Sequence, residues 1–221
     1  MLSIQHLELR DCAATLVHSF QNLTTLTFLV IEKVGDLSSF PGAFPGNNPL
    51  LTYLDIKSCP QLCSLKSQCL GSLEISDSHG LMFLPEIGTN GFCRLQTLSI
   101  ENCNDMTYLS MGLKNLTCLE HLIIMYCPSL VTLPQRLQHL VALQSLTIFG
   151  FSPKFMFLPE ELQNLKGLRN LEIRSYPGLK ALPEWIHKLI SLRSLAISNC
   201  HKVAFLPEGI KCLTLLQHLS I

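Results

Sequence analysis

The chain has 221 residues, of which 48% are hydrophobic and 14% charged, and sixteen basic side chains balance sixteen acidic ones to a formal net charge of zero. Because basic residues are not concentrated anywhere along the chain, the composition excludes the electrostatic footprint of a protein that binds nucleic acid or an anionic membrane. No apolar stretch approaches the roughly 18 residues of a membrane-spanning helix, and the first residues lack the pattern of a signal peptide. We therefore expect a cytoplasmic chain without a membrane span.

A segment of the form L-x-x-L-x-I recurs along the whole chain. Its alternation of apolar and polar residues is typical of a strand with one buried face, so the segments predict ten short strands stacked into one parallel sheet. The spacing is roughly 25 residues almost throughout, with shorter units before Leu26 and before Leu70. The segments begin loosely at Ile4 and then at Leu26, Leu51, Leu70, Leu95, Leu119, Leu143, Leu168, Leu192 and Leu216.

The stretch PGAFPGNNP after Phe40 is the loosest part of the chain, and we expect a loop there on the convex side. The unit LEHLIIMYCPSLVTLPQRLQHLVAL from Leu119 shows the regular pattern. After its strand, Cys127 and Pro128 turn the chain, and a helical turn is expected to begin at Pro134.

The tripeptide LPE occurs four times and LPQ once, each followed by apolar residues at helical spacing. Proline suits the first helical position because its missing N–H would be unpaired there, and an acid in the first turn meets the positive end of the helix dipole. In LPEWIHKL, at 182–189, we expect Leu182, Ile186 and Leu189 to point inward from a short convex helix. The recurring motif is therefore scaffold and not a site.

The ten cysteines are expected to be reduced, because disulfide frameworks belong to small domains that lack a core. Cysteines recur three residues after the last aliphatic residue of a strand, where a small buried side chain fits a tight turn. Cys59, Cys63 and Cys69 form the closest group, but their spacing is a weak zinc signal because no C-x-x-C pair occurs among them. The chain contains no G-x-S-x-G, H-E-x-x-H or glycine-rich phosphate loop, so we expect neither an enzyme nor a metal or cofactor site.

A repeat of this length with L-x-x-L-x-L is the signature of leucine-rich repeats. We therefore expect an α/β fold, a right-handed leucine-rich-repeat solenoid with a parallel concave sheet and short helices and turns on the convex side. Residues 1–221 are predicted to form a single domain of about nine to ten repeats without a polar capping unit at either end. We expect this chain to be a fragment of a longer protein and to aggregate in isolation.

The segments LEHLIIMYCPSLVTLPQRLQHL and LRSLAISNCHKVAFLPEGIKCL resemble the leucine-rich-repeat region of plant intracellular disease-resistance proteins, the nucleotide-binding leucine-rich-repeat receptors. The resemblance covers nearly the whole chain, although no P-loop occurs in it. It implies a cytoplasmic sensor in plant defence. Such a region binds a pathogen effector or a modified host protein, and in the resting receptor it contacts the nucleotide-binding domain and holds it inactive.

The strand residues that alternate with the buried aliphatic ones are expected to line the concave face. The scaffold does not require apolar residues there, and exposed apolar groups with a polar rim tend to mark binding sites. The alternative is that loops or another domain cover them in the intact protein. The first predicted patch is Ile123, Met125 and Phe149, bordered by Glu101, His121, Thr147 and Arg174, and the second is Phe28, Val30 and Tyr53.

These features predict non-catalytic protein recognition by a preformed curved surface. Two other functions stay open. One is a substrate-selecting adaptor of a ubiquitin ligase or a signalling scaffold, for which an F-box encoded upstream would be the sign. The other, a hydrolase hidden in the scaffold, would require an acid or histidine cluster that the sequence does not show.

Overall fold

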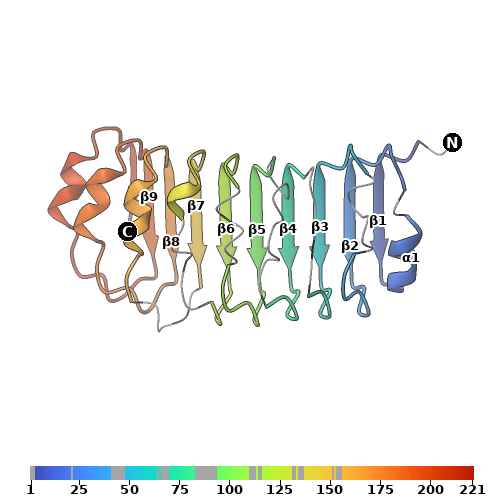
Figure 1. Ribbon diagram of the computed structural model, residues 1–221. Coiled ribbons are helices and arrows are strands. Elements are labelled where there is room, and N and C mark those ends of the chain that lie inside the picture. The colour runs from blue at the N-terminus through green and yellow to red at the C-terminus, as the bar shows by residue number, and fades with distance from the viewer. Residues whose placement is uncertain are drawn as a thin grey trace.

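The computed structural model describes residues 3–20, 22–40, 48–63, 65, 70–82, 94–109, 113, 116–130, 133, 137–150, 152 and 156–221. Within them, ten strands form one parallel sheet, and each strand lies beside its neighbours in sequence (Figure 1). The ten predicted strands and their parallel stacking are confirmed. The strands are β1 (His6–Arg10), β2 (Phe28–Glu32), β3 (Tyr53–Lys57), β4 (Ser72–Ser76), β5 (Thr97–Glu101), β6 (His121–Met125), β7 (Ser145–Phe149), β8 (Asn170–Arg174), β9 (Ser194–Ser198) and β10 (His218–Ser220).

The register of the sheet places equivalent residues of successive repeats side by side. Leu122 pairs with Leu98 on one side and with Leu146 on the other, and all three side chains are buried. Burying a leucine stabilises a fold by roughly 1.5–3 kcal/mol, and the same column continues through the neighbouring repeats. The core is therefore one continuous layer behind the sheet, and the alternating residues are left on the open, concave face.

A residue with left-handed backbone follows each of the strands β1 to β9. After β1 to β8 its N–H donates a hydrogen bond to the end of the next strand, as from Asn102 to the Met125 carbonyl at 3.0 Å and from Tyr126 to the Phe149 carbonyl at 2.8 Å. Eight of the nine residues are not glycine, which is unusual because left-handed backbone disfavours a side chain. The nine residues are Asp11, Lys33, Ser58, Asp77, Asn102, Tyr126, Gly150, Ser175 and Asn199.

The predicted cysteine column lies directly beneath these turns. The side chains of Cys59, Cys103 and Cys127 are completely buried, that of Cys200 is nearly so, and Cys12 in the first unit is partly exposed. Each of the four buried thiols donates to the carbonyl two residues earlier, at 3.4 to 3.5 Å. The expectation of a small buried side chain at this position is confirmed in these four units, whereas Phe151 in the same column lies outside the described residues.

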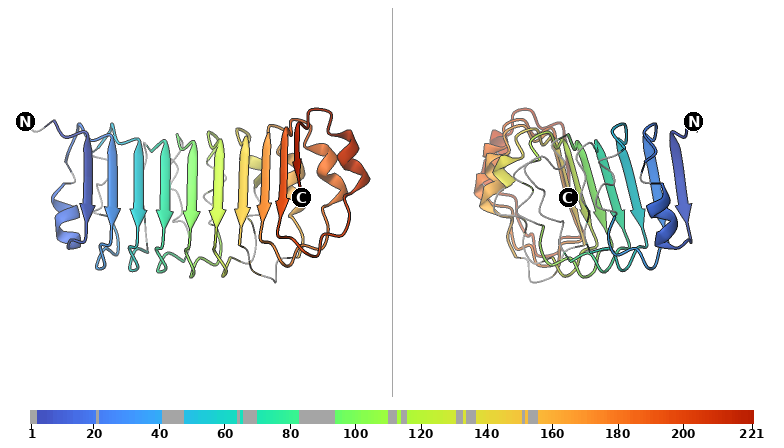
Figure 2. Two further views of the ribbon diagram at one scale, coloured as in Figure 1. Left: turned by 180° about the vertical axis from the view of Figure 1, so that it is seen from behind. Right: turned by 45° about the vertical axis from the view of Figure 1, so that its right-hand side comes forward.

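Helical turns return the chain on the side opposite the open face, as Figure 2 shows for the C-terminal half. In the described residues they are one α-helix, α1 (Ala14–Ser19), and the 3₁₀ helices η2 (Leu137–His139), η3 (Glu160–Asn164), η4 (Glu184–Lys188) and η5 (Glu208–Cys212). Successive 3₁₀ helices are in contact. Leu182, Ile186 and Leu189 are buried beneath them, as predicted for inward anchors.

The prediction that proline takes the first helical position is wrong by one residue. Pro159, Pro183 and Pro207 precede η3, η4 and η5 in an extended conformation, with ψ of 138°, 149° and 150°. The carbonyl of each accepts a hydrogen bond from the residue three positions on, for example from Ile186 N at 3.1 Å. Each helix is very short, so the tighter 3₁₀ winding replaces the expected α-helical turn. The corresponding Pro85 and Pro134 lie outside the described residues, as does most of the predicted loop after Phe40.

The last repeat leaves its inward positions exposed. Leu219 is 45% exposed, whereas its partner Leu195 in β9 is 0% exposed. Ile221, which continues the same inward alternation, is 68% exposed. The described C-terminal edge of the sheet therefore presents apolar side chains and unpaired strand backbone together.

Candidate protein-recognition surface

The first predicted patch is assembled as expected on the concave face. Ile123 and Met125 lie on β6, and Met125 pairs in register with Phe149 on β7. All three side chains are partly exposed. The parallel sheet brings them together because equivalent positions of adjacent strands lie about 4.8 Å apart.

Tyr126 enlarges this patch and was not among the predicted residues. Its ring lies 4.4 Å from the Phe149 ring, centroid to centroid, and the side chain is 44% exposed. We call Ile123, Met125, Tyr126 and Phe149 the apolar patch. The sequence did carry a signal, because the turn position after the other described strands holds aspartate, asparagine, serine, lysine or glycine.

Tyr126 adopts its place in the patch with a left-handed backbone, at φ of 51°. Such a conformation is costly for a bulky residue and is found preferentially where the surrounding structure imposes it, often at functional sites. Gly150, the turn residue of the next repeat, leaves room for the ring, because a Cβ there would lie 2.8 Å from Tyr126 Cδ1. The two turns are therefore matched in shape to hold the tyrosine ring over β7.

The predicted polar rim surrounds the apolar patch. Glu101 pairs in register with Met125, and Arg174 pairs with Phe149 on the opposite side. Arg174 forms an ion pair with Glu172, and Glu172 accepts a hydrogen bond from Thr147 at 3.4 Å. His121 stands exposed at the start of β6. The described surface thus places all seven predicted residues of this region on adjacent strands.

The second predicted cluster is an ordered aromatic ladder. The Phe28 and Tyr53 rings stack with centroids 4.2 Å apart and an interplanar angle of 2°, and His6 lies 5.2 Å from Phe28. Val30 is only 6% exposed, so a partner could reach its aromatic neighbours but hardly Val30 itself. Burial and a hydrogen bond to Glu74 raise the pKa of the Tyr53 hydroxyl, which stays protonated and fixes the end of the ladder.

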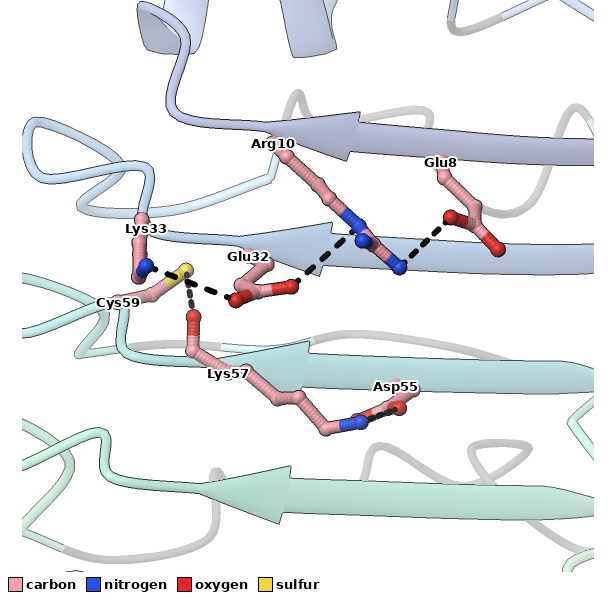
Figure 3. A network of polar contacts seen from close by, with 7 residues as sticks. All are labelled: Glu8, Arg10, Glu32, Lys33, Asp55, Lys57 and Cys59. Carbon is pink, nitrogen blue, oxygen red and sulfur yellow. Dashed lines mark hydrogen bonds and ion pairs between the residues drawn. The ribbon is translucent and has the colours of Figure 1, made fainter.

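The strands of the aromatic ladder, β1 to β3, also carry charged side chains, and Figure 3 shows the contacts between these charged groups. Arg10 contacts Glu8 at 2.8 Å and Glu32 at 3.4 Å, and Lys57 contacts Asp55 at 2.6 Å. Most of these groups are well exposed, and such ion pairs typically contribute at most about 1 kcal/mol each. They order the side chains of this part of the face more than they stabilise the fold.

The buried cysteines are not activated as nucleophiles. Burial raises the pKa of the Cys103 thiol to about 12 and that of Cys127 to about 11, so neither is a thiolate at neutral pH. In the described part of the chain, no three histidine, cysteine or acidic side chains gather so that they could hold a metal ion. Cys69, the third member of the weak zinc candidate, lies outside the described residues. None of the described helices is long and apolar enough to cross a membrane.

Comparison with known proteins supports the same architecture. The leucine-rich-repeat domain of the type III effector XopL is 25% identical and superposes with a TM-score of 0.81, covering 98% of this chain and 76% of that one. The fold is a leucine-rich-repeat solenoid. A leucine-rich-repeat protein of Leptospira interrogans is 24% identical, with a TM-score of 0.69 over 90% of this chain and 49% of that one. The Arabidopsis receptor kinase HAESA, solved in complex with the peptide hormone IDA, is 19% identical, with a TM-score of 0.53 over 98% of this chain and 40% of that one.

The family described as R13L1/DRL21 LRRs matches residues 157–221, the last part of the chain. No curated protein is similar enough in sequence to count as a relative. The chain spans about half or less of the length of the Leptospira protein and of HAESA. The leucine-rich-repeat fold is that of a protein-interaction module, and such domains are generally non-catalytic.

Proposed function

We propose that the concave face of this solenoid binds a protein partner and that the apolar patch is the centre of the contact. The observation that carries the proposal is the gathering of Ile123, Met125, Tyr126 and Phe149 on a face that the scaffold does not require to be apolar. Aromatic and methionine side chains are enriched in protein interfaces, and binding energy concentrates in a few such residues surrounded by a polar rim.

The concave surface is already folded in the free chain, which favours direct binding of a partner over binding that is coupled to folding. Every strand from β2 to β9 is hydrogen-bonded on both sides, and the turns after β1 to β8 are tied to the end of the next strand. A rigid surface loses little conformational entropy on binding, so more of the contact energy appears as affinity.

The biological role we propose is sensing in plant defence. The resemblance of the repeats to intracellular disease-resistance receptors and the R13L1/DRL21 match at 157–221 support it. In this role the chain is a single cytoplasmic repeat domain whose concave face contacts a pathogen effector or a guarded host protein. The nucleotide-binding domain of the same receptor is the second proposed partner, held inactive by the repeats until the first partner binds.

Capture from plant extract with three matched forms of the chain tests the proposal. The unaltered chain and Ile190→Ser should retain the same specific proteins, because Ile190 is exposed away from the concave face. Ile123→Ser combined with Met125→Ser should lose them. Retention of every protein by the double variant would refute the proposed surface.

The identity of the proteins lost by the double variant decides the finer role. A nucleotide-binding receptor domain or a pathogen protein among them would support the defence role. Components of a ubiquitin ligase would instead favour the adaptor function and contradict the proposed sensor.

A further inference from the structure

Two carboxylates on the concave face form no ion pair among the described residues. Glu8, Glu32, Asp55 and Glu172 each contact a nearby arginine or lysine. Glu74 on β4 and Glu101 on β5 do not, and the hydrogen bond that Glu74 accepts comes from the neutral hydroxyl of Tyr53.

Asp55 is a third acidic group beside these two, and we call Asp55, Glu74 and Glu101 the acidic strip. Asp55 pairs in register with Glu74, and its side chain is 6% exposed. One carboxylate oxygen contacts Lys57 at 2.6 Å, whereas Oδ1 is buried without a hydrogen-bond partner in the described structure. A buried acceptor left unbonded is costly, so Lys57 satisfies this carboxylate only in part.

Lys57 compensates this negative charge only in part. Its hydrogen bond to Asp55 raises the pKa of the ammonium most, and the charge of Glu74 adds a smaller effect in the same direction. Lys57 thus forms an ion pair with Asp55 and interacts with Glu74 only over a longer distance. The described strip is left with an excess of negative charge.

The acidic strip adjoins the apolar patch. Glu101 pairs in register with Met125, and Ser99 pairs with Ile123. The remaining concave residues of β4 and β5 have short side chains, so the carboxylates of Glu74 and Glu101 have no larger neighbours on their own strands. These short residues are Ser72, Ser76, Thr97 and Ser99.

We propose that the partner presents a basic side chain, arginine in preference to lysine, over Glu74 and Glu101 and an adjacent apolar side chain on the apolar patch. This inference rests on the proposed binding function of the concave face and adds the chemistry of the partner.

The geometry favours arginine. Glu101 lies one strand and two residues beyond Glu74, which corresponds to about 8 Å between their Cα atoms from standard strand spacing. A planar guanidinium has five donors and can bond both carboxylates at once, whereas an ammonium acts as a compact point charge. An acidic segment would meet three carboxylates and one lysine in this strip, and it would be repelled.

Selection of short random peptides displayed on phage, with the purified full chain as target, tests the inference. We expect enriched peptides to carry arginine close to an aromatic or aliphatic residue. Binding of these synthetic peptides should weaken on the order of tenfold in E74Q/E101Q, as expected for the loss of two partly exposed charge pairs, and should also weaken with added salt.

The matched control is E8Q/E32Q, which removes the same charge from the same face but outside the strip. It should leave the affinity within about twofold, a difference of roughly 0.4 kcal/mol. Circular dichroism of all variants confirms that they are folded. Equal weakening in both double variants would overturn the inference, because the effect would then reflect general charge and not the strip.

The remaining outcomes separate this inference from the proposed function. Peptides without a basic residue whose binding is lost in I123S/M125S would overturn the inference and leave the concave binding surface intact. Binding unaffected by any concave substitution would overturn both. Self-association of the chain through this face, detected by sedimentation and lost in I123S/M125S, would make a second copy the occupant and also overturn the inference.

Discussion

Replacing Gly150 with alanine should destabilise the solenoid through two separable effects. The backbone of Gly150 is left-handed, with φ of 68°, and a Cβ there would lie 2.8 Å from the Tyr126 ring. Left-handed backbone costs an alanine about 1–2 kcal/mol, and a stiffer unfolded chain offsets about 0.4–1 kcal/mol of this. Displacing the Tyr126 ring from Phe149 removes an aromatic pair that contributes about 0.5–1.5 kcal/mol. We expect a net loss of about 2 kcal/mol in the free energy of unfolding.

Urea unfolding followed by circular dichroism and by the fluorescence of Trp185 measures this loss. The same substitution in a Tyr126→Ser background should cost only about 1 kcal/mol, because no ring remains to be displaced, so the double-mutant cycle should give a coupling of about 1 kcal/mol. Gly167→Ala is the matched control. Gly167 does not have left-handed backbone, and the nearest atoms to a Cβ there are 3.6 Å away, so its replacement should be neutral or slightly stabilising.

The reasoning would be refuted if Gly150→Ala behaved like Gly167→Ala. A full loss with zero coupling to Tyr126 would leave the backbone effect but contradict the proposed fit between the Tyr126 ring and the Gly150 turn. That fit is the structural basis for including Tyr126 in the apolar patch.

Four further predictions concern the thiols, the core and the end of the sheet. Iodoacetamide should label exposed Cys118 rapidly and buried Cys103 and Cys127 only after unfolding, and mass spectrometry that finds similar rates in the native chain would contradict the buried column. Folding raises the pKa of these two thiols, so the stability that their protonated form contributes is complete below about pH 9 and should be lost as the pH rises through 11 to 12. C103A/C127A should therefore lose less stability over this pH range than the unaltered chain. An equal loss in both proteins would contradict the burial of these two thiols. Leu122→Ala should cost about 2–5 kcal/mol in urea unfolding because the side chain is fully buried, and a cost below about 1 kcal/mol would show that the predicted core is not packed there. Leu219→Lys should reduce the self-association of the 221-residue chain measured by sedimentation, since this leucine is exposed at the edge of the sheet. Unchanged self-association would show that the chain associates through another surface.

Much of the fold follows from the period of the sequence alone. Because the strand pattern returns at a nearly constant interval, each strand is expected to pair with the strands of the adjacent repeats. The concave residues could be named for the same reason, because side chains alternate along a strand and the inward ones are aliphatic in every repeat. Leu122 and Ile124 fix the side on which Ile123 and Met125 must lie.

Local backbone geometry was harder to predict. The LPE motif correctly located the convex segments, but the proline stands before the helix and the winding is 3₁₀, because chain length between strands is set by the stacking of whole repeats. Tyr126 was missed because a tyrosine with positive φ is unfavourable locally and is stabilised by its contact with Phe149 in the next repeat.

The sequence by itself determined the repeat, the strand order, the buried columns and the face that each strand residue occupies, since these depend only on periodicity. Only the tertiary structure decided which side chains on the concave face stack or form ion pairs with one another. It showed that Phe28 and Tyr53 stack, that Val30 is buried and that Asp55 pairs with Lys57, while Glu74 and Glu101 form no ion pair in the described chain. Such pairings depend on rotamers and on neighbours one repeat away in sequence, and no local pattern encodes them.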